Sequence, residues 1–259
     1  MQKKWLIILF CLPAVGSYLS SSFFSWINTT YGENIAHQLN RADLKQAGSY
    51  GGGNHTENFS HEPVIVVHGL SSIAGTFRSI GNYFLEHGYT KDEVYSTTWG
   101  KGAEDDIANV TLECGKVKQI RYFIEAVSRF TNSTVDVLAF SMGSPVARKA
   151  ILGGNCVDNG AYLGKPITEL IDTFISVGGA NYGSFLCDLM EPIGTCNKLN
   201  GLRCGSKYLR DINLSKLKHY EGSFVFSIYS TDDDMIGWKE CGNILGSVPN
   251  EDQAFKASF

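Results

Sequence analysis

The 259-residue chain lacks an excess of positive charge, the cysteine spacing of zinc sites, and internal repeats. Its 22 Lys and Arg against 26 Asp and Glu give a formal net charge of −4, which leaves no electrostatic footprint for nucleic acid or for an anionic membrane surface. No Cys-x-x-Cys pair and no neighbouring histidine pair occurs in the sequence, so we expect no metal site. Its length fits one α/β domain with a full core.

The chain also lacks an apolar run long enough to span a bilayer, which needs roughly 20 residues. Its first residues join a basic head, Lys3 and Lys4, to a short apolar run that ends at Val15. Ala14 and Gly16 supply the small residues of a cleavage site. We therefore predict a secretory signal peptide over residues 1–16 and a secreted, extracellular mature protein.

The cysteines agree with export. Removal of Cys11 with the signal leaves an even set, for which three disulfides are the natural interpretation in an oxidising compartment, with the pairing left open. These six are Cys114, Cys156, Cys187, Cys196, Cys204 and Cys241. Six Asn-x-Ser/Thr sequons predict a glycoprotein, although some will stay unmodified; they are Asn28, Asn54, Asn58, Asn109, Asn132 and Asn213.

Residues 17–62 are polar and contain a glycine cluster at 48–53. This stretch is too irregular for a core element, so we predict an arm that wraps the surface. The glycines precede a strand instead of following one, which argues against a phosphate loop and a nucleotide cofactor. We expect no cofactor of any kind.

From residue 63 onward, apolar runs alternate with helical patterns. Strands are predicted at Val64–Val67, 93–99, 134–140, 174–177 and 224–229, the last one visible, and helices at 77–87 and 114–130. This alternation, with short loops, predicts a doubly wound, mostly parallel sheet. Functional sites in such sheets lie at the carboxyl ends of the strands.

The strand at 134–140 stops on Ser141 and turns at once into a helical pattern. Ala139 and Gly143 give an Ala-x-Ser-x-Gly motif, and small residues at these positions let the strand and helix approach closely around a strained turn. Pro145 suits a first helical turn. The motif predicts a nucleophile elbow with Ser141 as the nucleophile; the alternative is a chance serine in a strand-to-helix turn.

A serine nucleophile needs donors for the charge that develops on the substrate carbonyl oxygen. We predict the backbone N–H groups of Met142, at a helix N-terminus, and of Leu70, just after the turn at His68 and Gly69. His68 itself more commonly shapes such a loop than takes part in catalysis.

Three aspartates, Asp232 to Asp234, directly follow the strand at 224–229. A carboxylate there is placed to orient a catalytic histidine, while at least two of the three form a solvated turn. We choose Asp233 because an Asp-x-x-Ile spacing lets Ile236 return to the core; Asp234 is the second choice.

These motifs together resemble the class 2 lipases, especially their secreted, cysteine-containing animal branch. The similar segments are 41–53, 63–70, 88–100, 135–154, 172–183 and 228–242. The resemblance implies an α/β-hydrolase domain over residues 63–259 and hydrolysis of carboxylic esters such as triacylglycerols. It assigns Ser141 as nucleophile, Asp233 as acid, and Leu70 and Met142 as oxyanion donors. Its partners would be a lipid or small ester, with transient contact at a lipid interface and no obligate protein partner.

The catalytic order in this fold is serine, carboxylate, histidine, yet no histidine follows His219. His61, His87 and His219 are poorly placed to substitute, and His37 and His55 lie on the predicted arm. Family members continue past 248–250 into a loop with the histidine and a closing helix. We therefore expect a C-terminally truncated lipase sequence that lacks the last strand and helix and is nearly inert. The alternatives are an inactive secreted binding glycoprotein and, less favoured, acyl transfer to an alcohol.

Overall fold

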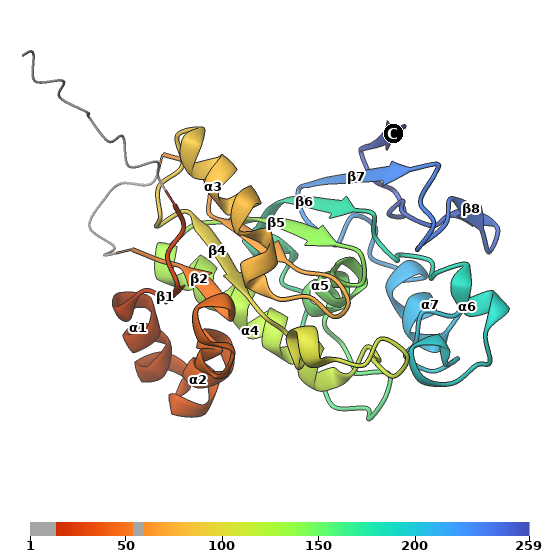
Figure 1. The fold of residues 1–259 in the computed structure, drawn as a ribbon, viewed down its shortest axis with the longest axis horizontal. Coiled ribbons are helices and arrows are strands. Elements are labelled where there is room, and N and C mark those ends of the chain that lie inside the picture. Colours follow the sequence, from red (N-terminus) through yellow and green to blue (C-terminus); the bar gives the residue numbers. More distant parts are fainter. Residues whose placement is uncertain (1–13, 54–59, 259) are drawn as a thin grey trace, which may run out of the picture.

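The computed structural model describes residues 14–53 and 60–258 and shows an eight-stranded sheet flanked by helices (Figure 1). The strand order is β1-β2-β4-β3-β5-β6-β7-β10, and only the β2–β4 pair is antiparallel. The strands are β1 (Tyr18–Leu19), β2 (Ser49–Gly51), β3 (Val64–Val67), β4 (Val94–Thr97), β5 (Val135–Phe140), β6 (Ile171–Val177), β7 (Phe224–Ser230) and β10 (Gln253–Ala257). The predicted doubly wound, mostly parallel sheet is confirmed.

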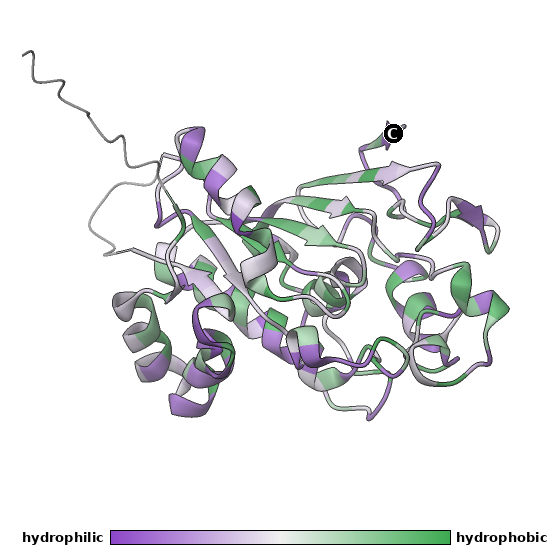
Figure 2. Cartoon of the chain, in the orientation of Figure 1, coloured by the Kyte–Doolittle hydropathy of each residue, from purple (hydrophilic) through white to green (hydrophobic). Residues whose placement is uncertain are grey.

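Helices cover both faces of the sheet. They are α1 (Ser21–Tyr31), α2 (Glu33–Asn40), α3 (Arg78–Glu86), α4 (Cys114–Thr131), α5 (Gly143–Leu152), α6 (Leu186–Leu189) and α7 (Lys207–Asn213). The main core cluster joins α1, α2, α4 and α5 to the central strands, whereas a small second cluster packs α3 on β2 and β4. Figure 2 shows the hydrophobic colouring concentrated on the central strands.

The prediction of an irregular arm over residues 17–62 is wrong for the part that the structure describes. Ser20 caps α1 by accepting from the N–H of Phe23, and Phe23 and Ile27 of α1 and Leu39 of α2 are fully buried. The ring of Phe23 lies 5.4 Å from that of Tyr95 in β4. Phe23 and Ile27 stand four residues apart on one face of α1, a helical spacing that the prediction overlooked, and helices this short need tertiary packing for stability.

The expectation that no strand follows β7 is also wrong. β10 pairs with β7 in parallel register over five residues, from Gln253 opposite Phe226 to Ala257 opposite Ser230. Its first four residues are exposed, and its five residues mix polar side chains with two alanines and one phenylalanine, so it lacks the continuous apolar run of a buried strand.

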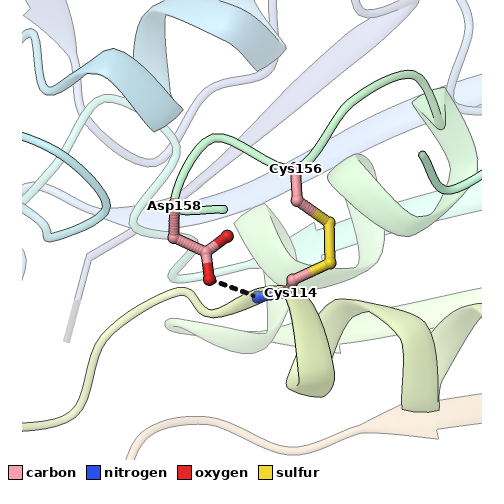
Figure 3. Close-up of side chains that lie close together, drawn as sticks. All are labelled: Cys114, Cys156 and Asp158. Atoms are coloured by element: carbon pink, nitrogen blue, oxygen red, sulfur yellow. Dashed lines mark hydrogen bonds between the residues drawn. A yellow bond between two sulfur atoms is a disulfide. The ribbon is translucent and has the colours of Figure 1, made fainter. Parts of the chain in front are cut away.

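Three disulfides are present, as the cysteine count predicted. Cys114–Cys156 joins the first turn of α4 to the chain after α5, and the Asp158 carboxylate accepts from the Cys114 N–H at 3.2 Å (Figure 3). Cys187–Cys196 closes a loop that begins in α6. Cys204–Cys241 joins the segment before α7 to the hairpin of β8 (Lys239–Glu240) and β9 (Asn243–Ile244). Such cross-links stabilise a fold mainly by restricting the unfolded chain.

The predicted signal peptide lies mostly outside the described residues, which begin at Ala14. Within the described ranges, no helix combines the length and the apolar character needed to cross a membrane.

Candidate active site

Ser141 lies in a strained turn between β5 and α5. Its φ of +50° is in the left-handed region, which costs a non-glycine residue on the order of 1 kcal/mol or more. Neighbouring backbone holds the turn in place: the Ser141 N–H donates to the Val177 carbonyl at 2.9 Å, and its carbonyl accepts from the Ala180 N–H at 3.2 Å. The loop after β6 therefore fixes the backbone conformation of the serine.

Two glycines allow the turn at 68–70 to lie against this serine. A Cβ on Gly69 would come within 2.9 Å of the Ser141 Cβ, and one on Gly143 within 2.3 Å of the His68 carbonyl oxygen. Neither position has room for a side chain, since both neighbours are part of the packed turn itself. The motif needs a small residue at position 143 because α5 approaches the end of β3 closely there.

The three groups that the sequence analysis assigns to ester chemistry at this turn make no hydrogen bond within the described residues. Within residues 14–53 and 60–258, neither the Leu70 N–H nor the Met142 N–H donates a hydrogen bond, and the Ser141 hydroxyl makes none either. Ser141 and Leu70 are half-buried, so the hydroxyl is not enclosed in the core. The Met142 amide also lies at the positive end of α5.

His68 is buried beneath the turn and cannot take a proton from Ser141. Its Nε2 accepts from the Trp99 N–H at 3.0 Å, so its Nδ1 carries the hydrogen that faces the Gly69 carbonyl at 2.7 Å. Its ring stacks on Trp99 with centroids 4.9 Å apart. Burial lowers the pKa of His68 to about 4, so the ring stays neutral. It shapes the loop, as the sequence analysis favoured.

Asp233 is the one aspartate of its triplet that turns toward the sheet. Its Oδ1 accepts from the Met235 N–H at 2.9 Å and the Ile236 N–H at 2.8 Å, and Ile236 is buried. Its Oδ2 lies 3.8 Å from the point where a Gly178 Cβ would stand. Gly178 directly follows Val177, the acceptor of the Ser141 N–H. Asp232 and Asp234 are exposed, whereas Asp233 is half-buried.

The histidines of the described chain have partners elsewhere. His37 lies 3.6 Å from the Glu33 carboxylate, His61 3.7 Å from Glu93, and His219 3.3 Å from Asp252. The Nδ1 of His87 faces the carbonyl of Tyr83. None of these side chains forms a hydrogen bond with Ser141, and His55 lies outside the described residues.

A buried network of polar side chains, which the sequence analysis missed, joins α5 to the end of β6 and to the loop that follows it. The Ser144 hydroxyl donates to Asn181 Oδ1 at 2.8 Å, and Asn181 Nδ2 donates to the Ser176 hydroxyl at 2.8 Å. Arg148, fully buried in α5, pairs with buried Glu221 at 2.9 Å. Because Asn181 follows Ala180, this network anchors the same loop that holds Ser141. The sequence signal for it was two adjacent charged residues, Arg148 and Lys149, inside an otherwise apolar helix.

The strand order, the strained serine at a strand-to-helix turn and the acidic loop after β7 define an α/β hydrolase. The sequence agrees with this class, because residues 61–258 match the family of class 2 lipases. The chain therefore belongs to the class 2 lipase family.

Solved structures share the fold at low sequence identity. Lipase B of Aspergillus fumigatus is 17% identical with a TM-score of 0.56, and the alignment covers 79% of this chain and 46% of that one. The mature BlEst2 lipase of Bacillus licheniformis is 10% identical with a TM-score of 0.50, covering 77% and 88%. A structure of the metagenome-derived lipolytic enzymes LipS and LipT is 12% identical with a TM-score of 0.52, covering 77% and 84%.

The chain spans less than half the length of the fungal lipase. No curated protein matches it.

Proposed function

We propose that the site at Ser141 is that of a serine ester hydrolase acting on acylglycerols or small carboxylic esters. The observation that carries the proposal is a strained serine whose hydroxyl and two adjacent amides are left without partners among the described residues. Membership of the class 2 lipase family supports the same reaction.

In this proposal, the Ser141 Oγ attacks the ester carbonyl carbon while its proton passes through a general base to the leaving alkoxide, which departs as the alcohol; water then hydrolyses the acyl-enzyme. The N–H groups of Leu70 and Met142 stabilise the oxyanion of each tetrahedral intermediate. Asp233 orients the general base and stabilises its protonated form.

The base is the component that the described residues do not supply. Loss of the histidine from such a triad costs about 10⁶-fold in rate and leaves roughly 10³- to 10⁴-fold over water. We expect the 259-residue chain to turn over esters near this residual level. A binding glycoprotein built on the hydrolase scaffold is the second candidate, because every described histidine is engaged away from Ser141.

Added imidazole distinguishes the two candidates. It should accelerate hydrolysis of a nitrophenyl butyrate by supplying the missing base, and the acceleration should disappear in Ser141→Ala but persist in Ser79→Ala, which alters an exposed serine of α3. A fluorophosphonate should label the parent and Ser79→Ala but not Ser141→Ala. Equal rates for all three proteins, with and without imidazole, would favour the binding protein.

We further propose that the protein is secreted and glycosylated, as in the cysteine-containing animal branch of the family. Its three disulfides and the exposed sequons at Asn28, Asn109 and Asn132 support this. Asn213 is different, because it is half-buried, its Nδ2 donates to the Asn181 carbonyl at 2.8 Å and its Oδ1 accepts from the fully buried Arg148.

Expression in a secretory cell line should give a product that begins at Ser17. Glycosidase treatment should change its mobility. The change should be unaltered in Asn213→Gln and reduced in Asn109→Gln.

A further inference from the structure

A groove lies at the opposite end of α5 from Ser141. Its volume of about 630 Å³ is enough for a ligand of several rings and far more than a single small anion fills. Its walls are the last turn of α5, the chain at 153–166, and α7 with the residues that follow it. Because α5 has ten residues and is about 15 Å long, the groove and the turn at Ser141 are separate sites.

Positive charge gathers in this groove, although the whole chain carries a formal charge of −4. Among the described residues that line it, the charged ones are Lys149, Lys165, Lys207, Arg210 and Asp211. The carboxylate is already paired, since Lys149 Nζ lies 2.6 Å from Asp211 Oδ2. Lys165, Lys207 and Arg210 are exposed, and their side chains form no ion pair or hydrogen bond within residues 14–53 and 60–258. Three cationic groups are therefore available to an anionic ligand.

The charged residues beside the lining do not cancel this excess. In the segments 153–170 and 205–219, they are the exposed Lys216, Lys218 and Glu169 and the half-buried Asp158. The Asp158 carboxylate accepts from the Cys114 N–H (Figure 3). At physiological salt, exposed charges more than about 8 Å apart are largely screened from one another. A ligand in the groove therefore meets the local positive charge rather than the charge of the whole chain.

An aromatic ring and an amide line the groove together with the cations. Tyr162 is 64% exposed, and it pairs with Asn155 in an antiparallel bridge, which directs both side chains to the same side of the backbone. Neither the Tyr162 hydroxyl nor the Asn155 amide has a hydrogen-bond partner in the part of the chain that the structure describes. The C–H face of a sugar packs on such a ring, while hydroxyl and amide groups bind sugar hydroxyls.

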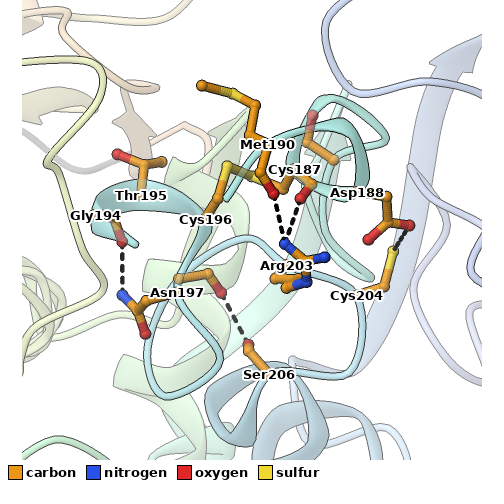
Figure 4. The surroundings of a disulfide bond; sticks show 12 residues. Cys187, Asp188, Met190, Gly194, Thr195, Cys196, Asn197, Arg203, Cys204 and Ser206 are labelled. Atoms are coloured by element: carbon orange, nitrogen blue, oxygen red, sulfur yellow. Dashed lines mark hydrogen bonds between the residues drawn. A yellow bond between two sulfur atoms is a disulfide. The ribbon is translucent and has the colours of Figure 1, made fainter. Parts of the chain in front are cut away.

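Hydrogen bonds and disulfides hold the walls of the groove in place. The Arg121 guanidinium donates to the Lys165 carbonyl at 2.7 Å. Just before α7, Arg203 Nη1 donates to the carbonyls of Cys187 and Met190 at 2.9 and 2.8 Å (Figure 4). Because the backbone of both walls is fixed, binding mainly costs the ordering of the exposed cationic side chains.

We propose that this groove binds a sulfated polysaccharide, with sulfate groups on Lys165, Lys207 and Arg210 and a sugar ring on Tyr162. Lysine and arginine bind such oxyanions through charge-assisted hydrogen bonds, and one polymer carries enough sulfates to reach all three cations. The choice of a polysaccharide over a nucleic acid rests on the proposed secretion of the chain, since sulfated polysaccharides lie outside cells. It does not rest on the hydrolase proposal.

Titration of the purified chain with a fluorescent heparin oligosaccharide at physiological salt tests the proposal. Lys165→Gln/Lys207→Gln/Arg210→Gln should weaken binding about tenfold or more, since three charge-assisted contacts are lost. Tyr162→Ala should weaken it by about threefold to tenfold without changing its dependence on salt, because the ring contacts the sugar and carries no charge.

The matched control is Lys45→Gln/Lys91→Gln/Lys239→Gln. It removes the same number of exposed cations from outside the groove, so it lowers the net charge equally and should bind heparin like the parent. Near-ultraviolet circular dichroism and intact mass should show that each variant is folded and has its three disulfides. Unlabelled heparin should displace the probe, and hyaluronan, which has carboxylates but no sulfate, should do so at least about tenfold less well.

Four results would overturn the proposal. The groove variant could bind as tightly as the parent, the control could lose affinity equally, Tyr162→Ala could have no effect, or hyaluronan or double-stranded DNA could displace the probe as well as heparin does. The DNA result would assign the groove to a nucleic acid. Ser141→Ala should bind heparin unchanged, so failure of the hydrolase proposal and failure of this one give different results.

Discussion

At the scale of single residues, Gly143 shows how tightly the elbow is packed. A methyl group there meets the His68 carbonyl at 2.3 Å and the Val67 carbonyl at 2.9 Å, and neither backbone atom can rotate away. Gly143→Ala should therefore lower the free energy of unfolding by about 1–3 kcal/mol, the usual cost of overpacking. Urea denaturation measures the change.

Gly115 provides the matched control. It lies in the first turn of α4, where an added Cβ would meet nothing within 4 Å, so Gly115→Ala should stabilise the protein by up to about 1 kcal/mol through helix propensity. If both variants shift stability in the same direction, the close approach at the elbow is not what requires glycine at 143.

Asp136 makes stability depend on pH at the opposite end of the sheet from Ser141. It lies in β5, with its carboxylate near those of Glu62 and Asp172, and Tyr89 also faces it. Burial, with the charge of Glu62 second, raises the pKa of Asp136 to about 7, against about 4 in an unfolded chain. Between about pH 4 and pH 7, the carboxyl group of Asp136 is therefore protonated in the folded state and ionised in the unfolded state.

The contribution of Asp136 to stability is therefore fully present below about pH 4 and is lost as the pH rises through about 7. Asp136→Asn imitates the protonated form. It should leave stability at pH 4 nearly unchanged and raise it at pH 8 by on the order of 1–2 kcal/mol, after discounting for solvent screening. Thermal unfolding across this range tests it, with Asp232→Asn, which changes an exposed aspartate, as the matched variant for comparison.

At the scale of elements, α1 behaves as part of the core. Phe23 packs on a ring of β4 and on rings of α4, since its centroid lies 5.4 Å from that of Tyr95 and 4.8 Å from that of Phe130. Phe23→Ala should cost about 3–5 kcal/mol of unfolding free energy. Phe24→Ala, on the same helix but half-buried, should cost clearly less. Equal, small losses would mean that α1 contributes little to the fold.

The elements that could be predicted from the sequence are those with a strong local pattern. β3 is a run of four buried β-branched residues, and α4 repeats its apolar side chains on one stripe, so both were found within a residue or two of their ends. α2 and β10 were missed because they are short and are buried, or paired, only through contacts distant in sequence, whereas α1 has Phe23 and Ile27 at helical spacing and was overlooked among the polar residues around it.

In the candidate site, too, features with a local sequence pattern could be predicted and features made by distant contacts could not. The turn at Ser141 could be read from one short motif, because small residues and a strand-to-helix switch occur within a few positions. The Arg148–Glu221 pair could not, since its partners are 73 residues apart and neither residue belongs to a recognisable pattern. The choice of Asp233 among three aspartates depended on the packing of Ile236 rather than on charge, and it stays a prediction.

At the scale of the whole molecule, the Arg148–Glu221 pair connects helix α5 with the segment between α7 and β7. Arg148 of α5 also donates to Asn213 Oδ1 at 2.8 Å and to the Ile212 carbonyl at 3.1 Å at the end of α7. Both charges are buried, and within the described chain Glu221 Oε2 has no hydrogen-bond partner. Removing the arginine alone therefore leaves an uncompensated buried carboxylate.

A double-mutant cycle follows from this burial. Arg148→Met should lower the free energy of unfolding by about 3–5 kcal/mol, whereas Arg148→Met/Glu221→Leu should recover much of that loss, because no charge then remains to be desolvated. Guanidinium denaturation of the parent, Arg148→Met, Glu221→Leu and the double variant gives the coupling energy between the two residues. If the double variant loses the sum of the two single losses, the residues act independently, and the link between α5 and the end of α7 rests on the hydrogen bonds that Arg148 donates to Asn213 and Ile212 instead.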